Sequence, residues 1–413
     1  MMQMRTHTCG ELRLANAGQR VKIVGWMENV RVVGQNFAFV VLRDFYGTTQ
    51  VVVENQEMMD IINGLNKEST ISVEGTVRER ASKNPKQATG DVEVVPEKIE
   101  VLGRCRYNSL PFEINRSREA DETQRLKYRY LDLRNPAVKS NIILRCQVVS
   151  ALRAAMTQHG FLEITTPILT ASSPEGARDY LVPARKHPGK FYALPQAPQQ
   201  FKQLLMTAGF DRYFQIAPCF RDEDARGDRS PGEFYQLDME MAYVDQEDVM
   251  AMTEKVIAAI WKSAGYEVQL PLPRITWKDA MDKYGSDKPD LRFGNPLVEL
   301  TEYFKNTPFR VFQAPYVGAV VFKGGAATPR RQFDAWQDWA RQRGAKGLAY
   351  VVFGENGELK GPVAKNLSDE ERNGLREAVG AEEGDAVFFA AGSRESAQLL
   401  LGAVRVELAS REG

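Results

Sequence analysis

The sequence predicts a multidomain α+β protein, and three observations support this prediction. The chain has 413 residues, more than one ordinary domain holds, and 43% of them are hydrophobic, which is enough to bury two or three cores. Short alternating strand patterns fill residues 20–101, whereas longer strands and helices alternate after residue 308. We therefore expect a small β-barrel near the start and a layered α+β domain at the end.

Residues 1–105 are expected to form the barrel. Their short strands are separated by turn residues, with one helix-like insert at 56–65. The turns at 34–36 and 44–47 join neighbouring strands as hairpins. The pattern favours an OB-fold, which commonly binds oligonucleotides on its sheet face, and a purely structural barrel is the alternative. The expected strands are 21–26, 37–42, 49–53, 71–78 and 92–101.

A charged linker is expected at residues 106–137, followed by a second domain at 138–300. Apolar residues recur at intervals of three and four over 140–159, which predicts an amphipathic helix. The next predicted strand, 161–169, contains Pro167, and proline cannot donate a ladder hydrogen bond. This strand is therefore expected at the edge of a sheet or at an interface.

The most informative local pattern is a hairpin at residues 220–241, in which a polar turn separates two apolar strands. Arg221 and Glu223 lie two positions apart and project to the same strand face. A guanidinium can bind a phosphate through two parallel hydrogen bonds, and a carboxylate can accept one from an adenine amino group. The returning strand supplies Phe234, whose ring can stack on a base. These features are typical of a nucleotide site.

A third domain is expected at residues 301–413, after a predicted helix at 246–264. Alternation of strands and helices on this scale indicates a small layered α+β domain. The expected strands are 317–322, 348–353 and 385–391, and the expected helices are 329–342, 368–379 and 393–409.

Composition and charge exclude several classes of protein. Basic and acidic residues number 54 each, so any nucleic acid must be bound by local patches rather than by an overall positive field. The four cysteines are far apart and lack histidine clusters beside them, so we expect a reducing cytoplasm and no metal-ligand set. No signal-peptide pattern and no run of 18 apolar residues occurs, so no membrane partner is expected.

A series of motifs resembles the class II aminoacyl-tRNA synthetases and, within them, the bacterial-type aspartyl-tRNA synthetases. The hairpin FRDEDARGDRSPGEFYQLDMEM at 220–241 resembles motif 2, and GFLEITTPILT at 160–170 resembles motif 1. The phrases YRYLDLR at 128–134, SPEGARDYLVP at 173–183 and FYALPQAPQQFK at 191–202 follow the order of the family. The resemblance covers nearly the whole chain.

The resemblance implies a catalytic domain built on the class II antiparallel sheet and interrupted by an inserted, GAD-like domain at 301–413. It implies aspartate, ATP and tRNA as substrates, with the barrel reading the anticodon. It also implies a homodimer contact through 161–169, and a monomer with an unpaired edge strand is the alternative. The matching anticodon-binding positions are Arg31, Phe39, Gln50 and Glu93.

The resemblance also outlines an active site, in which Arg221 is the expected catalytic residue and α-phosphate ligand. Lys202 would select aspartate over asparagine by charge. Ala197 stands where many relatives carry serine, so one hydroxyl contact to the substrate is expected to be missing or replaced by water. The matching ATP-binding positions are Arg221, Asp222, Glu223, Ser230 and Phe234. The matching aspartate-binding positions are Glu175, Gln199, Lys202, Arg221 and Asp238.

Simpler interpretations of these residues remain open. Gln196, Gln199 and Gln200 can begin a solvent-facing helix. Lys202 can form an ordinary ion pair, and Phe39 can belong to the barrel core. Gln50 and Glu93 can occupy solvated strand positions.

The sequence departs from the family because it lacks a segment that resembles motif 3. The ligands for the magnesium ion that accompanies ATP are expected in that missing part. The catalytic domain is therefore expected to be incomplete, as in a fragment, and to form little adenylate alone. A non-catalytic tRNA-binding paralogue and an asparaginyl-type relative are the alternatives.

Overall fold

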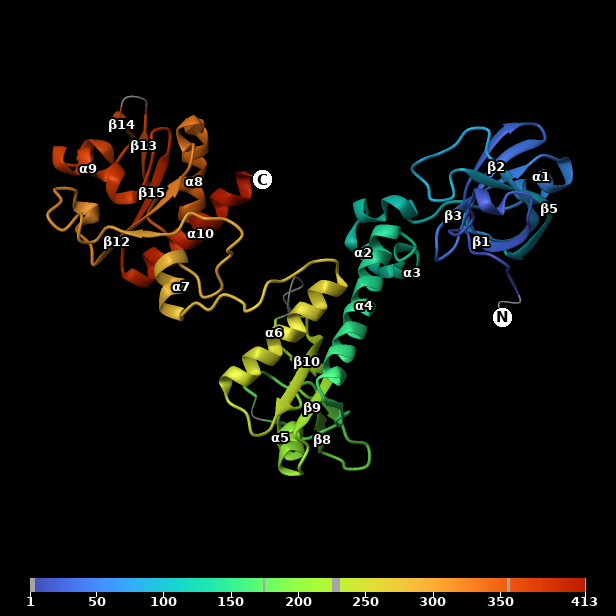
Figure 1. Ribbon diagram of the computed structural model, residues 1–413, viewed down its shortest axis with the longest axis horizontal. Coiled ribbons are helices and arrows are strands. Elements are labelled where there is room, and N and C mark those ends of the chain that lie inside the picture. The colour runs from blue at the N-terminus through green and yellow to red at the C-terminus, as the bar shows by residue number, and fades with distance from the viewer. Residues whose placement is uncertain (1–3, 174, 225–230, 355–356, 413) are drawn as a thin grey trace. The chain divides into compact units, whose positions relative to one another are not determined.

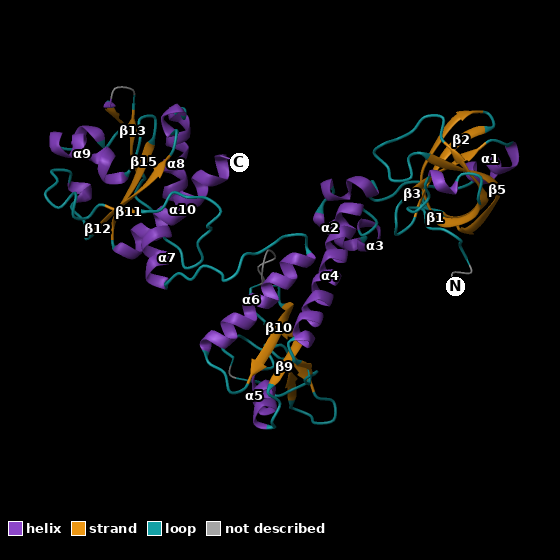
Figure 2. Cartoon of the chain, viewed as in Figure 1, coloured by secondary structure: helices purple, strands orange, loops and turns teal. Residues whose placement is uncertain are grey.

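The computed structural model describes residues 4–173, 175–224, 231–354 and 357–412 (Figure 1). They fall into two compact units, which divide between Leu270 and Pro271. The first unit contains a closed barrel and a three-stranded sheet, and the second contains a five-stranded sheet (Figure 2). Each unit has hydrophobic cores of its own.

The barrel closes in the strand order β1-β2-β3-β5-β4. Strands β3 and β5 run parallel, and the other neighbouring pairs run antiparallel. Alternate residues of β1 are buried, and helix α1, capped by Asn55, packs three apolar side chains into the same core. The predicted OB-fold is therefore confirmed. Its elements are β1 Arg20–Gly34, β2 Phe37–Arg43, β3 Thr48–Val53, α1 Gln56–Asn63, β4 Thr70–Glu79 and β5 Val92–Gly103.

Short helical segments connect the barrel to the long helix α4. The Asn135 side chain accepts a hydrogen bond from the backbone N–H of Ala137 and caps α4. Pro136 occupies the first helical position, where its missing N–H leaves no bond unmade. The elements are η2 Ile114–Glu119, α2 Glu122–Lys127, α3 Arg129–Asp132 and α4 Pro136–Gln158.

The sheet of the first unit has the strand order β10-β9-β6. Strands β9 and β10 form an antiparallel hairpin, and the short β6 runs parallel to β9 at the edge. The strand predicted at 161–169 is much shorter in the structure, because its pairing with β9 ends at Glu163. Beyond it, the backbone N–H of Thr166 donates to the side chain of Gln215 instead of to a neighbouring strand, and Thr170 forms an isolated bridge with Ala193 of β8. The elements are β6 Leu162–Glu163, β7 Leu181–Pro183, β8 Phe191–Ala193, α5 Gln199–Thr207, β9 Arg212–Phe220, β10 Glu233–Met241 and α6 Gln246–Ser263.

The second unit is a three-layered α+β structure around a sheet of order β11-β12-β15-β13-β14. Every residue of β12 is buried, because α9 packs on one face of the sheet and α8 and α10 pack on the other. The unit begins at Pro271, earlier than the boundary expected at 301, and so includes α7. Its helices are α7 Trp277–Tyr284, α8 Arg330–Gln342, α9 Asp369–Val379 and α10 Arg394–Glu412. Its strands are β11 Val298–Glu299, β12 Tyr316–Phe322, β13 Ala349–Phe353, β14 Leu359–Lys360 and β15 Ala386–Gly392.

Among the described helices, none combines the length and the hydropathy that a membrane span requires.

Candidate functional site

The β9–β10 hairpin has two chemically different faces. Leu237 and Met239 of β10 lie on one face and pack with apolar residues of α4 and α6. Phe234 and Asp238 lie on the opposite face, because alternate residues of a strand point to opposite sides. Lys202 reaches Asp238 from α5, so α5 covers part of this second face. We call this second face of the hairpin the site face.

Lys202 is bound by two carboxylates on the site face. Its Nζ lies 2.9 Å from Asp238 Oδ1 and 3.2 Å from Glu240 Oε2. The side chain of Lys202 is only 13% exposed. Burial alone would lower the pKa of Lys202, but the hydrogen bonds and attraction of Asp238 and Glu240 outweigh burial and raise it above the usual value. Lys202 is therefore a fixed positive charge at neutral pH.

The Asp238 carboxylate lies in a buried environment beside Tyr213 of β9. Burial and the negative charge of Asp238 raise the pKa of Tyr213, so this phenol stays protonated. The second oxygen of Asp238, Oδ2, and the Tyr213 hydroxyl are both buried without a hydrogen bond of ordinary geometry to the described residues, and the hydroxyl interacts with the Asp238 carboxylate. A carboxylate oxygen in this state attracts a hydrogen-bond donor such as an ammonium group.

Arg221 follows β9 and lies over the ring of Phe234 on the site face. Its guanidinium carbon is 5.0 Å from the ring centroid, a cation–π distance. The backbone N–H of Arg221 donates to the carbonyl of Gly232 at 2.9 Å, which holds the two strands together at this end. A Cβ at position 232 would lie 2.4 Å from the Tyr180 hydroxyl, so the glycine lets the Tyr180 side chain approach the hairpin closely.

These two pairs share the site face of the hairpin. Phe234 and Asp238 are four residues apart on β10, which corresponds to about 13 Å along a strand. The positive groups of Arg221 and Lys202 therefore lie on the same side of the sheet. This arrangement can bind a ligand that carries a planar ring, a phosphate and a separate carboxylate.

The segment that carries Glu175 is tied to the hairpin. Arg178 Nε donates to the carbonyl of Asp222 at 2.8 Å, and the backbone N–H of Asp222 donates to the carbonyl of Arg178 at 2.9 Å. Gln196 is only 2% exposed, and its side chain bonds both the N–H and the carbonyl of Ala177. Gln196 thus fixes this segment and does not face solvent.

The remaining predicted residues have fewer contacts. Gln199 is half-buried and precedes Lys202 by three positions on α5, so the two lie on the same helix face. Glu175 and Glu223 are exposed, and within the described part of the chain their side chains form no hydrogen bond or ion pair. The predicted ATP-binding residue Ser230 lies outside the described residues.

Sequence reasoning missed Glu240, which shapes the site, and it considered Gln196 only as part of a solvent-facing helix start. The alternation of β10 could have identified Glu240, because it lies two positions after Asp238 and so projects to the same face. No local signal identifies Gln196, since its partners are 17 to 19 residues away.

On the barrel, the structure pairs Arg31 with Phe39. The two residues are opposite each other in β1 and β2, and the Arg31 guanidinium carbon is 5.1 Å from the Phe39 ring centroid. Phe37 packs edge-on against the same ring, with centroids 5.1 Å apart. Phe39 is half-buried, so part of it remains open to a base.

Gln50 and Glu93 are bonded to each other rather than solvated separately. They lie opposite each other in β3 and β5, and Gln50 Nε2 donates to Glu93 Oε2 at 2.9 Å. Arg78 Nε donates to Glu93 Oε1 at 3.0 Å, and Arg80 Nη2 donates to Gln50 Oε1 at 3.0 Å. The sequence did not single out these two arginines, which complete a polar network on the barrel.

The phrase at 128–134 forms a joint between the barrel and α4. Arg134 lies over the ring of Trp26 of β1, 4.3 Å from the centroid, and pairs with Glu68 of the barrel. Lys139, in the first turns of α4, donates from Nζ to the carbonyl of Phe45 at 2.6 Å. We call these three contacts the barrel joint.

Asp132 holds together the short helices beside the barrel joint. It is fully buried and accepts hydrogen bonds from Ser117 at 2.6 Å and from Arg125 and Arg129. Burial opposes ionisation, but the hydrogen bonds from Ser117 and Arg125 outweigh it and lower the pKa of Asp132. The short helices α2 and α3 are thereby tied together.

Within the described ranges, no group of three histidine, cysteine, aspartate or glutamate residues could hold a metal ion.

Known proteins were compared with this chain. Residues 121–379 match the family described as class II tRNA synthetases (D, K and N), and residues 21–102 match the family described as OB-fold nucleic acid binding domains. The chain is 68% identical over 418 residues to the aspartate–tRNA(Asp/Asn) ligase of Bifidobacterium longum strain DJO10A, covering 99% of this chain and 69% of the relative. It is 56% identical over 412 residues to the ligase of the same name from Mycobacterium avium strain 104, with the same coverage.

A solved structure shows the same fold. Asparaginyl-tRNA synthetase from Pyrococcus horikoshii, complexed with asparaginyl-adenylate, aligns with a TM-score of 0.59 at 19% identity, covering 97% of this chain and 95% of that structure. At this identity the match supports the fold alone. The match over residues 121–379 and the identity to the Bifidobacterium relative show that the chain belongs to the class II tRNA synthetases, in the family of bacterial aspartyl-tRNA synthetases.

Proposed function

We propose that this chain carries the aspartate, ATP and tRNA sites of an aspartate–tRNA ligase. In the first step, an oxygen of the aspartate α-carboxylate attacks the α-phosphorus of ATP. The bond to the bridging oxygen breaks, and pyrophosphate leaves. In the second step, a ribose hydroxyl of the tRNA attacks the aspartyl carbonyl and loses its proton to solvent, and AMP leaves with the electron pair of the broken carbonyl–oxygen bond.

The observation that carries this proposal is the position of Lys202 between Asp238 and Glu240. Glu240 is the more exposed of the two partners, at 31%, so the side-chain carboxylate of aspartate can replace it beside Lys202. The substrate ammonium can then approach Asp238, with Gln199 and Glu175 as further acceptors. Asparagine lacks the negative charge and would leave Lys202 without that pair.

Arg221 and Phe234 supply the nucleotide half of the site. Phe234 offers a ring face for adenine, and Arg221 offers a guanidinium for the α-phosphate, where negative charge accumulates in the transition state. Asp222, Glu223 and Ser230 are assigned to the same nucleotide, with Glu223 accepting from the adenine amino group.

The barrel is proposed to read the anticodon. Phe39 supplies a stacking surface, and the Gln50–Glu93 pair can exchange its internal hydrogen bond for bonds to a base edge. Arg31 can meet a phosphate or a base. The relatives are named for both the aspartate and the asparagine tRNA, so both tRNAs belong in the test.

A homodimer is proposed through residues 161–169. The edge strand β6 and the segment after it expose three apolar side chains, Leu162 at 55%, Ile168 at 43% and Leu169 at 56%. A second copy can cover these side chains and the open edge of β6.

The first prediction tests Lys202. We expect Lys202→Met to weaken aspartate binding by about 100-fold, equivalent to about 3 kcal/mol, because a buried charge partner is removed. Titration calorimetry with aspartate and with asparagine measures the effect, and aspartate-dependent pyrophosphate exchange measures adenylate formation. The same exchange assay tests the expectation that this chain forms little adenylate.

Two controls accompany this experiment. Lys190→Met changes an exposed lysine of the same unit and should leave aspartate affinity unchanged. Retained ATP binding in Lys202→Met would show that the hairpin is intact. If aspartate affinity is unaltered in Lys202→Met, then Lys202 does not bind aspartate, and the proposed amino-acid site is wrong.

A further inference from the structure

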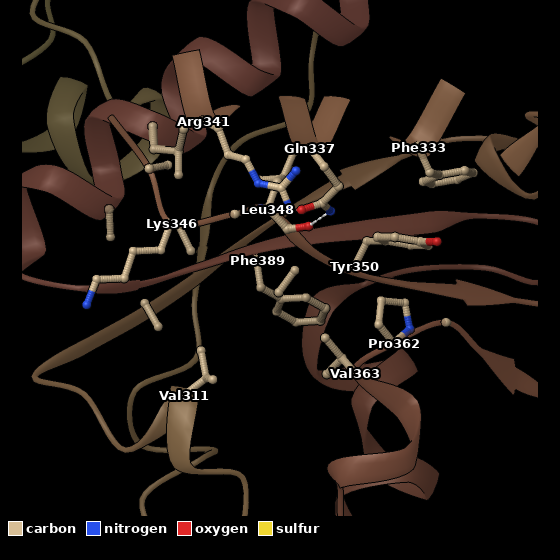
Figure 3. Close-up of a pocket in the computed structure, with 18 of the residues that line it drawn as sticks. Val311, Phe333, Gln337, Arg341, Lys346, Leu348, Tyr350, Pro362, Val363 and Phe389 are labelled. Atoms are coloured by element: carbon tan, nitrogen blue, oxygen red, sulfur yellow. Dashed lines mark hydrogen bonds between the residues drawn. The ribbon is translucent and has the colours of Figure 1, made fainter. Parts of the chain in front are cut away.

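The second unit contains a large open cavity that the proposed reaction does not use. Its volume is about 1670 Å³, larger than an ordinary small-molecule pocket. Residues of α8, β13, β14, β15 and α10 line it (Figure 3). A cavity of this size can accept a short stretch of polymer.

The cavity concentrates positive charge. Six basic side chains and one acidic side chain, Asp334, line it. Residues 271–413 as a whole contain 20 basic and 20 acidic residues, so the excess is a local feature rather than a result of composition. The basic residues are Arg330, Arg341, Arg343, Lys346, Lys360 and Lys365.

Three of these cations form neither an ion pair nor a cation–π contact with the described residues, and are available to a ligand. Arg343 instead lies over Trp339, 3.9 Å from the ring centroid. Arg341 pairs with Asp338 and Lys360 pairs with Glu358, each at 2.9 Å. In contrast, Arg330, Lys346 and Lys365 are exposed and form no ion pair with any described residue. Available cations around a concavity attract a ligand that carries several negative charges.

The cavity also offers apolar surface. In Figure 3, Arg341 and Lys346 border the cavity on one side, with Tyr350 and Pro362 on the other. Phe333 stacks behind Tyr350, with centroids 4.5 Å apart, and Val311 is 56% exposed. A ligand that fills this cavity therefore combines flat apolar groups with spaced anionic groups.

We propose that this cavity binds an unpaired stretch of RNA. Phosphates contact Arg330, Lys346 and Lys365, and bases lie against Tyr350 and Val311. An RNA duplex buries its base faces and would leave the apolar surface uncovered. The inference rests on the proposed function in one respect only, namely that the RNA belongs to the tRNA substrate.

The test removes the three available charges together. The variant Arg330→Gln/Lys346→Gln/Lys365→Gln is compared with the matched control Lys283→Gln/Lys288→Gln/Arg376→Gln, which changes three exposed basic residues of the same unit outside the cavity. Both are made in the full chain with Phe39→Ala, so that stacking on the barrel does not conceal the effect. Fluorescence anisotropy with a short labelled single-stranded RNA measures affinity at several salt concentrations.

We expect the cavity variant to bind the RNA at least about 10-fold more weakly, and the slope of log affinity against log salt to fall by about 2, since each lost contact removes about 0.7. Val311→Glu, which places a negative charge beside the bases, should weaken binding without removing a cation. Equal losses in the cavity variant and its control would overturn the proposal. A preference of the cavity for duplex RNA or for an acidic peptide would also overturn it.

A separate arm distinguishes this proposal from the ligase proposal. The cavity variant should weaken binding of the aspartate tRNA and of unrelated tRNAs by the same factor, because phosphates carry no sequence information. A chain with intact Phe39 that shows no preference for the aspartate tRNA would count against the ligase proposal. The conclusion that the cavity binds unpaired RNA, which rests on the short RNA, would not change.

Discussion

Cys219 shows how the site face controls the chemistry of a single residue. The thiol lies beneath the nucleotide half of the site, opposite Phe234 in the strand register, and donates to Gln236 Oε1 at 3.3 Å. Burial and the charge of Asp238 raise the pKa of Cys219 to about 11, although Arg221 opposes this effect. Few thiolates form at neutral pH, so Cys219 is unreactive despite its position.

This pKa leads to a prediction about alkylation. At pH 8, iodoacetamide should modify the exposed Cys146 first, and Cys219 should resist modification in the folded chain. Peptide mapping by mass spectrometry at successive times measures the order. A sample unfolded in urea provides the control, in which both residues should react at similar rates. Equal rates in the folded chain would contradict the burial of Cys219.

At the scale of elements, Asp132 determines how the joint responds to acid. Its pKa is lowered in the folded chain, so its contribution to stability is fully present above the unfolded pKa, near 4, and is lost as pH falls through the folded value. We expect Asp132→Asn to lower the Tm of the first unit by about 5 °C at pH 7, because Arg125 and Arg129 lose a buried partner.

The difference in Tm between the Asp132→Asn variant and the unaltered chain should shrink when calorimetry is repeated at successively lower pH. A constant difference from pH 7 to pH 3 would show that Asp132 acts through packing rather than charge.

The barrel joint gives a second prediction at this scale. Arg134 and Trp26 are in cation–π contact, so their contributions to stability should not be additive. A double-mutant cycle with Arg134→Met and Trp26→Leu, followed by urea denaturation, should give a coupling free energy of about 1 kcal/mol. The pair Arg153 and Glu163, far from the barrel in sequence and exposed, serves as a comparison with weaker coupling. A coupling of zero would mean that the two side chains do not interact in solution.

The sequence predicted regular elements better than contacts, for a physical reason. Strands such as β2 and helices such as α6 follow local alternation and capping, which are properties of neighbouring residues. The strand at 161–169 was overestimated, because its length depends on a pairing partner elsewhere in the chain. The bonds of Gln196 and the Arg134–Glu68 pair, 66 residues apart, arise only when the chain folds.

At the scale of the whole molecule, the separate cores predict that the two units unfold in separate transitions. Leu401 of α10 is fully buried in the second unit, and Leu401→Ala should cost about 2–5 kcal/mol there. Calorimetry should show one transition shifted to lower temperature and the transition of the first unit unchanged. The counterpart Val73→Ala, in the barrel core, should leave the second unit unchanged. A single transition that shifts in both variants would show that the units unfold together.

Helix α4 connects the barrel to the β9–β10 hairpin within the first unit. Its 23 residues span about 35 Å at 1.5 Å per residue. One end carries Lys139 of the barrel joint, and residues towards the other end pack beneath the β9–β10 hairpin. A helix is stiff along its axis, so α4 acts as a strut between the surface proposed to read an anticodon and the surface proposed to activate an amino acid. Strain introduced by RNA at the barrel would therefore reach the hairpin through the barrel joint and this single helix.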